Sequence, residues 1–351
     1  MKIKSSLFFI FCLPLISMVS NNSCNDININ KKIEQNTKQP VIAIKGITLE
    51  APPNPIDSIV FKNMQRINAD WAAIIPFAFS RKGQPAIQYN SPRQWWGERE
   101  DGIIKSIELA HQQKMKVMLK PQLWIGGGEY TGHFTLDGDS SWAIWETNYK
   151  NYIMYNAMIA AKTNTELLCI GTEMDETVKQ RPQFWSNLID SIKTVYKGKL
   201  TYAANWNCYK DFTNWQKLDY IGIDAYFPLS NEVTPTVENL LQGWQPHFDA
   251  IKQYTTQQKR PILFTEYGYR SMNQCAFEPW QSYNKSEVNL IGQQNAYEAL
   301  YQKFANEAWF AGGFIWKWQV DDAKAGGPNN HNYTPQNKPV EATISKWYSN
   351  K

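Results

Sequence analysis

The sequence predicts an α/β protein of the TIM (β/α)8 barrel class, folded as a single domain. From residue 40 onward, short apolar runs rich in β-branched residues alternate with amphipathic helical patterns. Strict alternation of the two element types indicates a parallel sheet, and eight such units are the number that closes a barrel. The length of 351 residues does not argue against one domain, because α/β barrels routinely use about 250 residues or more.

Eight segments have the composition of buried strands with polar or turn-forming residues at their ends. The expected strands are 41–49, 71–79, 116–124, 166–173, 199–206, 220–227, 261–268 and 311–318. The expected helices are 57–68, 98–114, 140–163, 182–197, 211–218, 237–257, 290–308 and 340–349. An open doubly wound sheet is the competing architecture, but it usually has a glycine-rich turn after its first strand, and here that turn reads TLEAPPNP.

The N-terminus has the pattern of an export signal. Lys2 and Lys4 precede an apolar stretch over residues 7–19, too short to span a bilayer as a mature helix, which predicts a signal peptide over residues 1–23. Cys24 follows directly and resembles a bacterial lipoprotein cleavage site, where the new terminal cysteine is acylated. We therefore expect an exported protein, either a cell-surface or periplasmic lipoprotein or a secreted protein.

Residues 24–39 are rich in Asn, Lys and Gln and contain no aromatic residue, which is typical of a flexible tether. The barrel is then expected to occupy residues 40–351. We expect a monomer that meets the membrane only through a lipid on Cys24.

Charge and motif spacing exclude several classes of function. The net charge of +4, from 36 basic and 32 acidic residues, is too small and too dispersed for a nucleic-acid-binding surface. The four histidines show neither HxH nor HExxH spacing, so no metal site is expected. The triplet at 126–128 lacks the Lys and Ser/Thr of a phosphate-binding loop, no GxSxG elbow is present, and no cofactor is expected. The class of function that remains is catalysis by carboxyl groups.

Two glutamates stand where predicted strands end. Glu173 follows the run ELLCIGT, and Glu266 follows RPILFT. The carboxyl ends of barrel strands form the active face of a TIM barrel, so two acids at matching strand ends favour a catalytic pair over two ordinary surface charges. Met174 and Trp206 are expected to surround Glu173 with apolar groups and to raise its pKa.

Other side chains near the strand ends are candidates for binding substrate. Trp 15, Tyr 18 and Phe 16 give an aromatic fraction of 14%, and binding clefts concentrate rings beside a few polar groups. Asp224 is expected to be structural. The substrate-binding candidates are Lys120, Gln122, Trp124, Asn205, Trp206, Tyr226, Trp316 and Trp318.

Three motifs stand at predicted strand ends, namely GTE (171–173), DAY (224–226) and FTEYG (264–268), and two more, KPQLW (120–124) and WKW (316–318), accompany them. Together they resemble the motifs of the clan A glycoside hydrolases, and most closely those of glycoside hydrolase family 113. The clan usually has Asn before its acid/base Glu, but this sequence has a threonine there, and family 113 is similar in carrying a small hydroxyl residue.

The resemblance implies a TIM barrel in which Glu173 is the acid/base and Glu266 the nucleophile. It also implies that Tyr226 donates a hydrogen bond to Glu266. Characterised members of the family are endo-β-1,4-mannanases, so β-mannan is the implied polysaccharide substrate.

The expected function is therefore that of a retaining endo-glycosidase that cleaves a β-1,4-linked polysaccharide. A glycosidase acting on β-glucan or on a peptidoglycan glycan remains an alternative, because the connections at 80–100, 125–140, 228–236 and 321–338 would set specificity. A non-catalytic glycan-binding protein on the same scaffold is the alternative from another class. Such proteins would have lost one strand-end glutamate, whereas both are present here.

The export signal predicts that the mature chain starts at or before Cys24. Mass spectrometry of the cell-associated protein distinguishes the two forms, because an acylated Cys24 means a membrane anchor and an unmodified, shortened N-terminus means secretion. Intact Met1 in a cytoplasmic fraction would contradict both.

Overall fold

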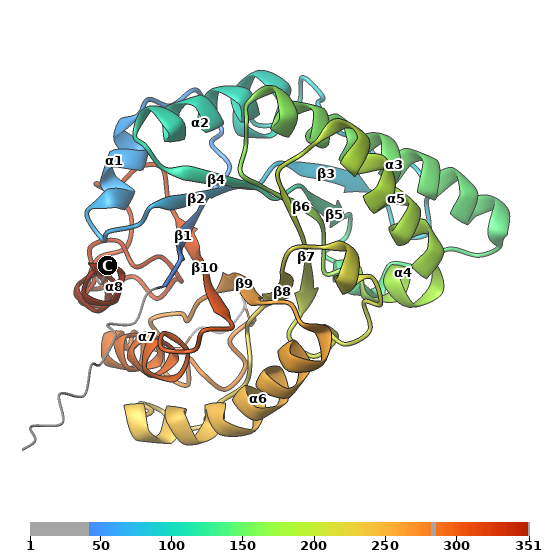
Figure 1. Ribbon diagram of the computed structural model, residues 1–351. Coiled ribbons are helices and arrows are strands. Elements are labelled where there is room, and N and C mark those ends of the chain that lie inside the picture. Colours follow the sequence, from blue (N-terminus) through green and yellow to red (C-terminus); the bar gives the residue numbers. More distant parts are fainter. Residues whose placement is uncertain (1–41, 282–285, 350–351) are drawn as a thin grey trace, which may run out of the picture. The chain divides into compact units, whose positions relative to one another are not determined.

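The computed structural model describes residues 42–281 and 286–349, and within them a closed barrel of eight parallel strands surrounds the centre of Figure 1. Hydrogen bonds join the strands in the order β1-β10-β9-β8-β7-β6-β4-β2, and β2 returns to β1. The barrel strands are β1 (Ile44–Leu49), β2 (Trp71–Ile74), β4 (Lys116–Leu119), β6 (Leu167–Thr172), β7 (Lys199–Asn205), β8 (Ile221–Asp224), β9 (Ile262–Tyr267) and β10 (Phe310–Trp318). The predicted single-domain TIM (β/α)8 fold is confirmed.

Helices surround the strands on the outside of the barrel (Figure 1). They are α1 (Ile59–Gln65), α2 (Glu100–Gln112), α3 (Asp139–Lys162), α4 (Asp175–Gln180), α5 (Pro182–Val195), α6 (Val237–Gln258), α7 (Leu290–Phe304) and α8 (Val340–Ser349). The local sequence explains where two of these helices begin. Pro182 occupies the first position of α5, where its missing N–H costs nothing, and Thr236 accepts a hydrogen bond from the Asn239 N–H at 3.1 Å in a capping box before α6.

Two predicted strands are each divided by a proline. Residues 71–79 form β2 and a second strand, β3 (Phe77–Ser80), while residues 116–124 form β4 and β5 (Gln122–Ile125). Pro76 and Pro121 stand at the breaks and cannot donate to the ladder. Beyond them, β3 and β5 pair with each other in a separate two-stranded parallel sheet.

The expected helix at 211–218 is wrong. The structure has only a 3-10 turn there, Trp215–Lys217, with further 3-10 turns at Trp96–Glu98 and Thr131–His133. Asp, Thr and Asn residues compete for backbone hydrogen bonds in this segment, and the Trp215 indole N–H donates to the Tyr209 carbonyl at 2.9 Å. The short helix α4 was not predicted.

The interior of the barrel changes from apolar to polar along its axis. A separate apolar cluster consists of strand residues: Ile44, Trp71, Ala73, Met118, Leu167, Cys169, Ala203, Leu263 and Phe314. Gly46 leaves the space that Phe314 fills, because a Cβ on it would lie 2.4 Å from the ring. Two residues after Met118 and Leu263, Lys120 and Thr265 continue the inward-facing rows with polar groups.

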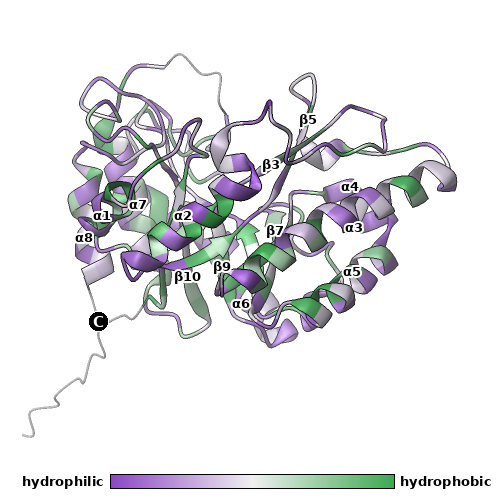
Figure 2. Ribbon diagram, turned by 90° about the horizontal axis from the view of Figure 1, so that it is seen from above, coloured by the Kyte–Doolittle hydropathy of each residue, from purple (hydrophilic) through white to green (hydrophobic). Residues whose placement is uncertain are grey.

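The main core lies between the barrel and its helices. In Figure 2 the strands are largely hydrophobic, whereas the helices show alternating hydrophobic and hydrophilic bands, as expected when one helix face packs on a sheet. Rings of α3, α5 and β7 form part of this core, and Trp145 stacks on Tyr149 at 4.8 Å between ring centroids. Much of the aromatic fraction is therefore packing rather than binding surface.

The predictions for the N-terminus, namely the signal peptide at 1–23, the tether at 24–39 and lipidation of Cys24, concern residues outside the described part of the chain. Within residues 42–281 and 286–349, every helix is too short or too polar to cross a membrane.

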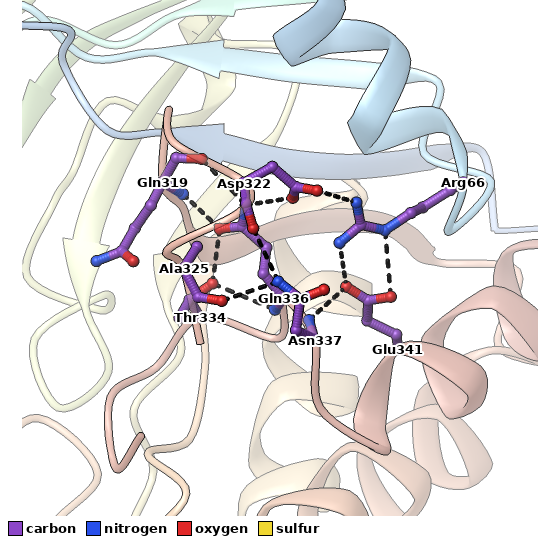
Figure 3. A network of polar contacts seen from close by, with 8 residues as sticks. All are labelled: Arg66, Gln319, Asp322, Ala325, Thr334, Gln336, Asn337 and Glu341. Atoms are coloured by element: carbon purple, nitrogen blue, oxygen red, sulfur yellow. Dashed lines mark hydrogen bonds and ion pairs between the residues drawn. The ribbon is translucent and has the colours of Figure 1, made fainter. Parts of the chain in front are cut away.

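A polar network fixes the segment that follows β10 (Figure 3). Arg66, at the end of α1, donates to Glu341 of α8 at 2.6 and 3.2 Å and also pairs with Asp322. Gln336 donates to Asp322 at 2.7 Å, and Asn337 donates to the Asp322 carbonyl at 2.8 Å. These contacts tie the loop between β10 and α8 to two helices of the barrel wall.

Replacing Arg66 tests how much this network contributes to stability. Arg66→Met removes the charge-assisted bonds to two carboxylates, and we expect a loss of about 1–2 kcal/mol, reduced from the value of a buried network because the side chain is partly exposed. Chemical denaturation measures the free energy of unfolding. Lys150→Met, on the exposed face of α3, is the matched control. Equal stability of the two variants would contradict the prediction.

Candidate active site

Glu266, in β9, lies among hydrogen-bond donors at the polar end of the barrel. Its Oε2 accepts from the Tyr226 hydroxyl at 2.9 Å, and its Oε1 accepts from Gln122 Nε2 at 3.1 Å. The Lys120 ammonium donates to the same Oε1. A cation, an amide and a phenol thus surround the carboxylate, an environment that suits a negative charge.

Lys120 is fully buried and joins two acids that come from neighbouring strands. Besides Glu266, it contacts both oxygens of Asp224 at 3.2 and 3.3 Å. Burial alone would lower the pKa of Lys120, but the charges of Asp224 and Glu266 raise it above its ordinary value. The lysine is therefore a fixed cation.

Asp224 lies beneath the pocket and accepts a further hydrogen bond from Thr265 at 2.7 Å. Burial and the charge of Glu266 raise the pKa of Asp224 to about 7, against the opposing effects of Lys120 and Thr265. This carboxyl has no place in the pocket lining and acts within the buried network, as expected for a structural residue.

Glu173 lies at the end of β6 in a different environment. Burial raises its pKa well above the ordinary value of 4.5, and the charges of Asp224 and Glu266 raise it further, whereas Lys120 opposes the shift. Its backbone has a φ of 49°, in the left-handed region, which costs a non-glycine residue about 1–3 kcal/mol. The Glu173 carboxyl therefore gives up its proton less readily than an ordinary glutamate.

An extra residue interrupts the pairing of β6 and β9 just before each glutamate. Between Cys169 and Thr172, β6 advances one residue more than β7, and between Phe264 and Glu266, β9 advances one more than β8. Such bulges break the alternation of side chains and redirect those that follow. Both glutamates line the same pocket as a result.

That pocket has a volume of about 600 Å³ and combines carboxyls, amides and rings. Of the residues predicted from the sequence, Glu173, Glu266, Asn205, Trp206, Tyr226 and Trp316 line it. The predicted hydrogen bond from Tyr226 to Glu266 is present. Such a lining offers two acids to one ligand and apolar ring faces beside them.

Several pocket residues were not predicted from the sequence, because they lie in the connections between strands and helices. They are Tyr130, His133, Asn207, Trp280 and Tyr333. The Trp280 ring stacks on Trp206 at 5.4 Å between centroids and forms a wall with it. Tyr130, His133 and Tyr333 lie in two connections, 125–140 and 321–338, that were expected to set specificity, but the sequence does not say which of their side chains turn inward.

Tyr130 belongs to a chain of hydrogen bonds along one side of the pocket. Asn205 Nδ2 donates to the Tyr130 hydroxyl, which in turn donates to Asp175 Oδ2 at 3.0 Å. The chain fixes the orientation of the Asn205 amide, because its NH2 group is directed at the tyrosine.

Four predicted binding residues do not line the pocket, and one of them, the lysine, has another role. Lys120 is buried beneath it, since its ammonium pairs with two carboxylates. Trp318 is fully buried against Arg66. From Ile315 onward, β10 advances three residues while its partner β1 advances two, and this bulge breaks the alternation of side chains. Trp316 and Trp318 therefore do not share a face of the strand.

The other two are Gln122 and Trp124, which lie on β5, beyond the proline break. Gln122 reaches Glu266 from this strand, but Trp124 is 51% exposed and lines a different hollow. Within the part of the chain that the structure describes, no group of three or more His, Cys, Asp and Glu residues could hold a metal ion.

Comparisons with known proteins match the chain to one family model and to solved barrel structures. The model of Glycoside Hydrolase Family 113 matches residues 56–338. Among solved structures, a complex of a GH113 β-1,4-mannanase is 24% identical, covers 89% of this chain and 100% of that chain, and has a TM-score of 0.77. The GH113 β-mannanase AaManA from Alicyclobacillus acidocaldarius, in complex with ManMIm, is 23% identical, with 88% and 98% coverage and a TM-score of 0.77.

A more distant likeness shares the barrel alone. The β-glucuronidase of Ruminococcus gnavus is 12% identical, with a TM-score of 0.58, and the match covers 88% of this chain and 50% of that one. No curated protein sequence matches the chain.

The raised pKa of Glu173 predicts a stability that depends on pH. Because the folded chain binds this proton more tightly than the unfolded chain, the contribution of Glu173 to the free energy of unfolding falls as the pH rises above 4.5. Glu173→Gln removes the titration, so the variant should be more stable than the wild type at about pH 8, and the gain should vanish below about pH 4. Denaturation across this range measures it, with Glu176→Gln on α4 as control. A gain that persists unchanged in acid would contradict the assignment.

Proposed function

Because the chain belongs to glycoside hydrolase family 113, we propose that this glycoside hydrolase is a retaining endo-β-1,4-mannanase that uses Glu173 and Glu266. The observation that carries the proposal is the contrast between two carboxyls in one pocket. Glu173 has a raised pKa, whereas Glu266 accepts hydrogen bonds from a cation, an amide and a phenol. Glycoside cleavage needs such a pair, one group to give a proton and one to meet the positive charge at the anomeric carbon.

In the first step, an oxygen of Glu266 attacks the anomeric carbon as the bond to the departing sugar oxygen breaks. Glu173 gives its proton to that oxygen, so the leaving chain departs as an alcohol and a covalent glycosyl ester remains on Glu266. Tyr226 and Gln122 hold the attacking carboxylate in place, since each donates to one of its oxygens.

In the second step, Glu173 is ionised and acts as the base. It takes a proton from water while the water oxygen attacks the anomeric carbon and the ester bond to Glu266 breaks. Each step inverts the configuration at the anomeric carbon, so the product retains the configuration of the substrate. A retaining pair requires carboxyl groups about 5–5.5 Å apart, which is the spacing we expect here.

The preference for β-mannan is supported by the two family 113 structures named above, both of β-mannanases, and by the ring-lined pocket. Trp206 and Trp280 form one wall and Trp316 contributes another surface, on which the apolar faces of sugars can stack. An exported location, which the pattern of residues 1–24 favours, fits a polymeric substrate.

The nucleophile is tested by Glu266→Ala. We expect turnover of every substrate to fall on the order of 10⁴- to 10⁶-fold, because the first step cannot occur whatever the leaving group. Azide should restore reaction and give a glycosyl azide of inverted configuration, identified by NMR. Residual activity near the wild-type level would exclude this role.

The acid/base is tested by Glu173→Ala. Activity on polysaccharide should fall about 10²- to 10⁴-fold, while an activated aryl glycoside, whose leaving group needs no proton, should still form the glycosyl ester. Azide should then give a product of retained configuration. Glu176→Ala is the control. Rescue products of the same anomeric form from both glutamate variants would overturn the mechanism.

The substrate is tested with purified β-mannan, β-glucan and peptidoglycan glycan. We expect hydrolysis of β-mannan with a rapid fall in viscosity and release of oligosaccharides of mixed length, as internal cleavage requires. Release of single sugars alone, or a preference for another polymer, would refute the corresponding part of the proposal.

A further inference from the structure

Two exposed tryptophans lie outside the candidate active site. Among the described residues, three tryptophans expose more than a third of their surface, namely Trp95, Trp124 and Trp280, and only Trp280 lines the central pocket. Trp95 and Trp124 are each 51% exposed, and Phe79 is 36% exposed. Large exposed rings gathered together usually mark a binding surface.

Two of these rings, Phe79 and Trp124, share a face of the small sheet formed by β3 and β5. Phe79 is the register partner of Trp124, and it also bridges Gln88 through two backbone hydrogen bonds of 2.8 Å. Residues directly opposite each other in a sheet point to the same side. Gln88, Phe79 and Trp124 therefore form a row, which we call the aromatic row.

A second row on the same face leads back to the candidate active site. Phe77 is the partner of Gln122, two residues before the aromatic row on each strand, about 6.6 Å closer to the barrel. Gln122 donates to Glu266 at 3.1 Å, and Phe77 contacts Trp124 edge to face at 6.5 Å. The aromatic row is thus continuous with the carboxylate proposed as nucleophile.

Two hollows flank Phe79 and have the composition of sugar sites. One, of about 520 Å³, is lined by Trp124 with Arg81 and Gln84. The other, of about 380 Å³, is lined by Trp95 with Gln94. Both include Phe79 and Gln88. A ring face beside amides and a guanidinium suits a hexose, which has apolar C–H faces and hydroxyls around its edge.

The Trp95 side of this surface is held in position by the backbone. Gly97 N–H donates to the Pro52 carbonyl at 2.8 Å, and a Cβ on Gly97 would lie 2.3 Å from the Pro52 ring, so the segment packs closely on the loop after β1. The Gln94 amide donates to the Phe77 carbonyl at 2.7 Å. A site fixed before the ligand arrives loses less entropy on binding.

We propose that Phe79, Trp95 and Trp124 form a second glycan-binding site, which holds sugar units of the β-1,4-linked hexose chain that lie beyond the central pocket. The inference rests on the proposed function for the identity of the chain. It adds that binding extends over the β3–β5 sheet, on the Gln122 side of Glu266.

Binding is measured first, because it does not depend on turnover. Trp124→Ala and Trp95→Ala are compared with the wild type by affinity electrophoresis in gels containing β-mannan or β-glucan. We expect each variant to bind the retarding polymer roughly tenfold more weakly, the loss of one stacking contact. Ile144→Ala, which removes a 53% exposed side chain from α3, is the control and should bind as the wild type does. Thermal denaturation checks that each variant is folded.

Catalysis separates this site from the central pocket. With an aryl glycoside that fills only the pocket, Trp124→Ala and Trp95→Ala should retain the wild-type kcat/KM. With the polymer, both should show a kcat/KM roughly tenfold lower, mainly through a higher KM. Equal losses on both substrates would mean that the rings support the pocket itself, and would overturn the proposal.

The remaining outcomes are equally decisive. If the wild type hydrolyses the polymer and both tryptophan variants bind and cleave it equally well, the second site is excluded while the proposed function stands. If the wild type cleaves no polymer but is retarded by one, and the tryptophan variants are not, the site stands and the function fails. A dimer that either variant converts to monomers would identify the surface as a protein interface and exclude the glycan site.

Discussion

The ion pair that Lys120 makes with Asp224 and Glu266 is the interaction on which the geometry of the site depends. Two carboxylates in a water-poor barrel interior cost several kcal/mol each unless a cation and further donors compensate them. Lys120, the residue directly after β4, supplies that cation, and its acids come from β8 and β9. The ion pair thus joins three segments that are far apart in sequence. The residues that follow Lys120 in the KPQLW motif (120–124) contribute to the same site. Pro121 ends the barrel ladder, and Gln122 then reaches Glu266 from the separate sheet.

The two glutamates differ because their surroundings differ, although both end a barrel strand. Donors converge on Glu266, whereas burial and nearby negative charge act on Glu173. This asymmetry reduces the stability of the fold, because Glu173 combines a left-handed backbone with a partly buried carboxyl. Active sites commonly retain such unfavourable features because they shift protonation toward what the chemistry requires.

Loops complete the site, and the rest of the fold holds them in place. Tyr333 lies on the segment after β10, which Arg66, Gln336 and Asn337 fasten to the outer helices (Figure 3). Tyr130 is held through Asp175. On the side of Gln122, the proline breaks in two strands create the β3–β5 sheet and with it the exposed rings. The barrel thus positions the acids, while the additions to the barrel shape the surface around them.

The resemblance to a known family implied the contact of Tyr226 with Glu266. The sequence by itself determined the alternation of barrel strands with most of the helices, the barrel class and the two strand-end glutamates. These follow from local periodicity and from the rule that parallel strands present their carboxyl ends on one face. Only the tertiary structure decided that Lys120 is a buried counterion, that Trp318 is core and that Trp124 faces a separate hollow. The alternation of side chains along a strand predicts which way each side chain points only while the strand is regular. Bulges in β6, β9 and β10 and the prolines after β2 and β4 break it, and loop rings such as Trp280 are placed by contacts with residues distant in sequence.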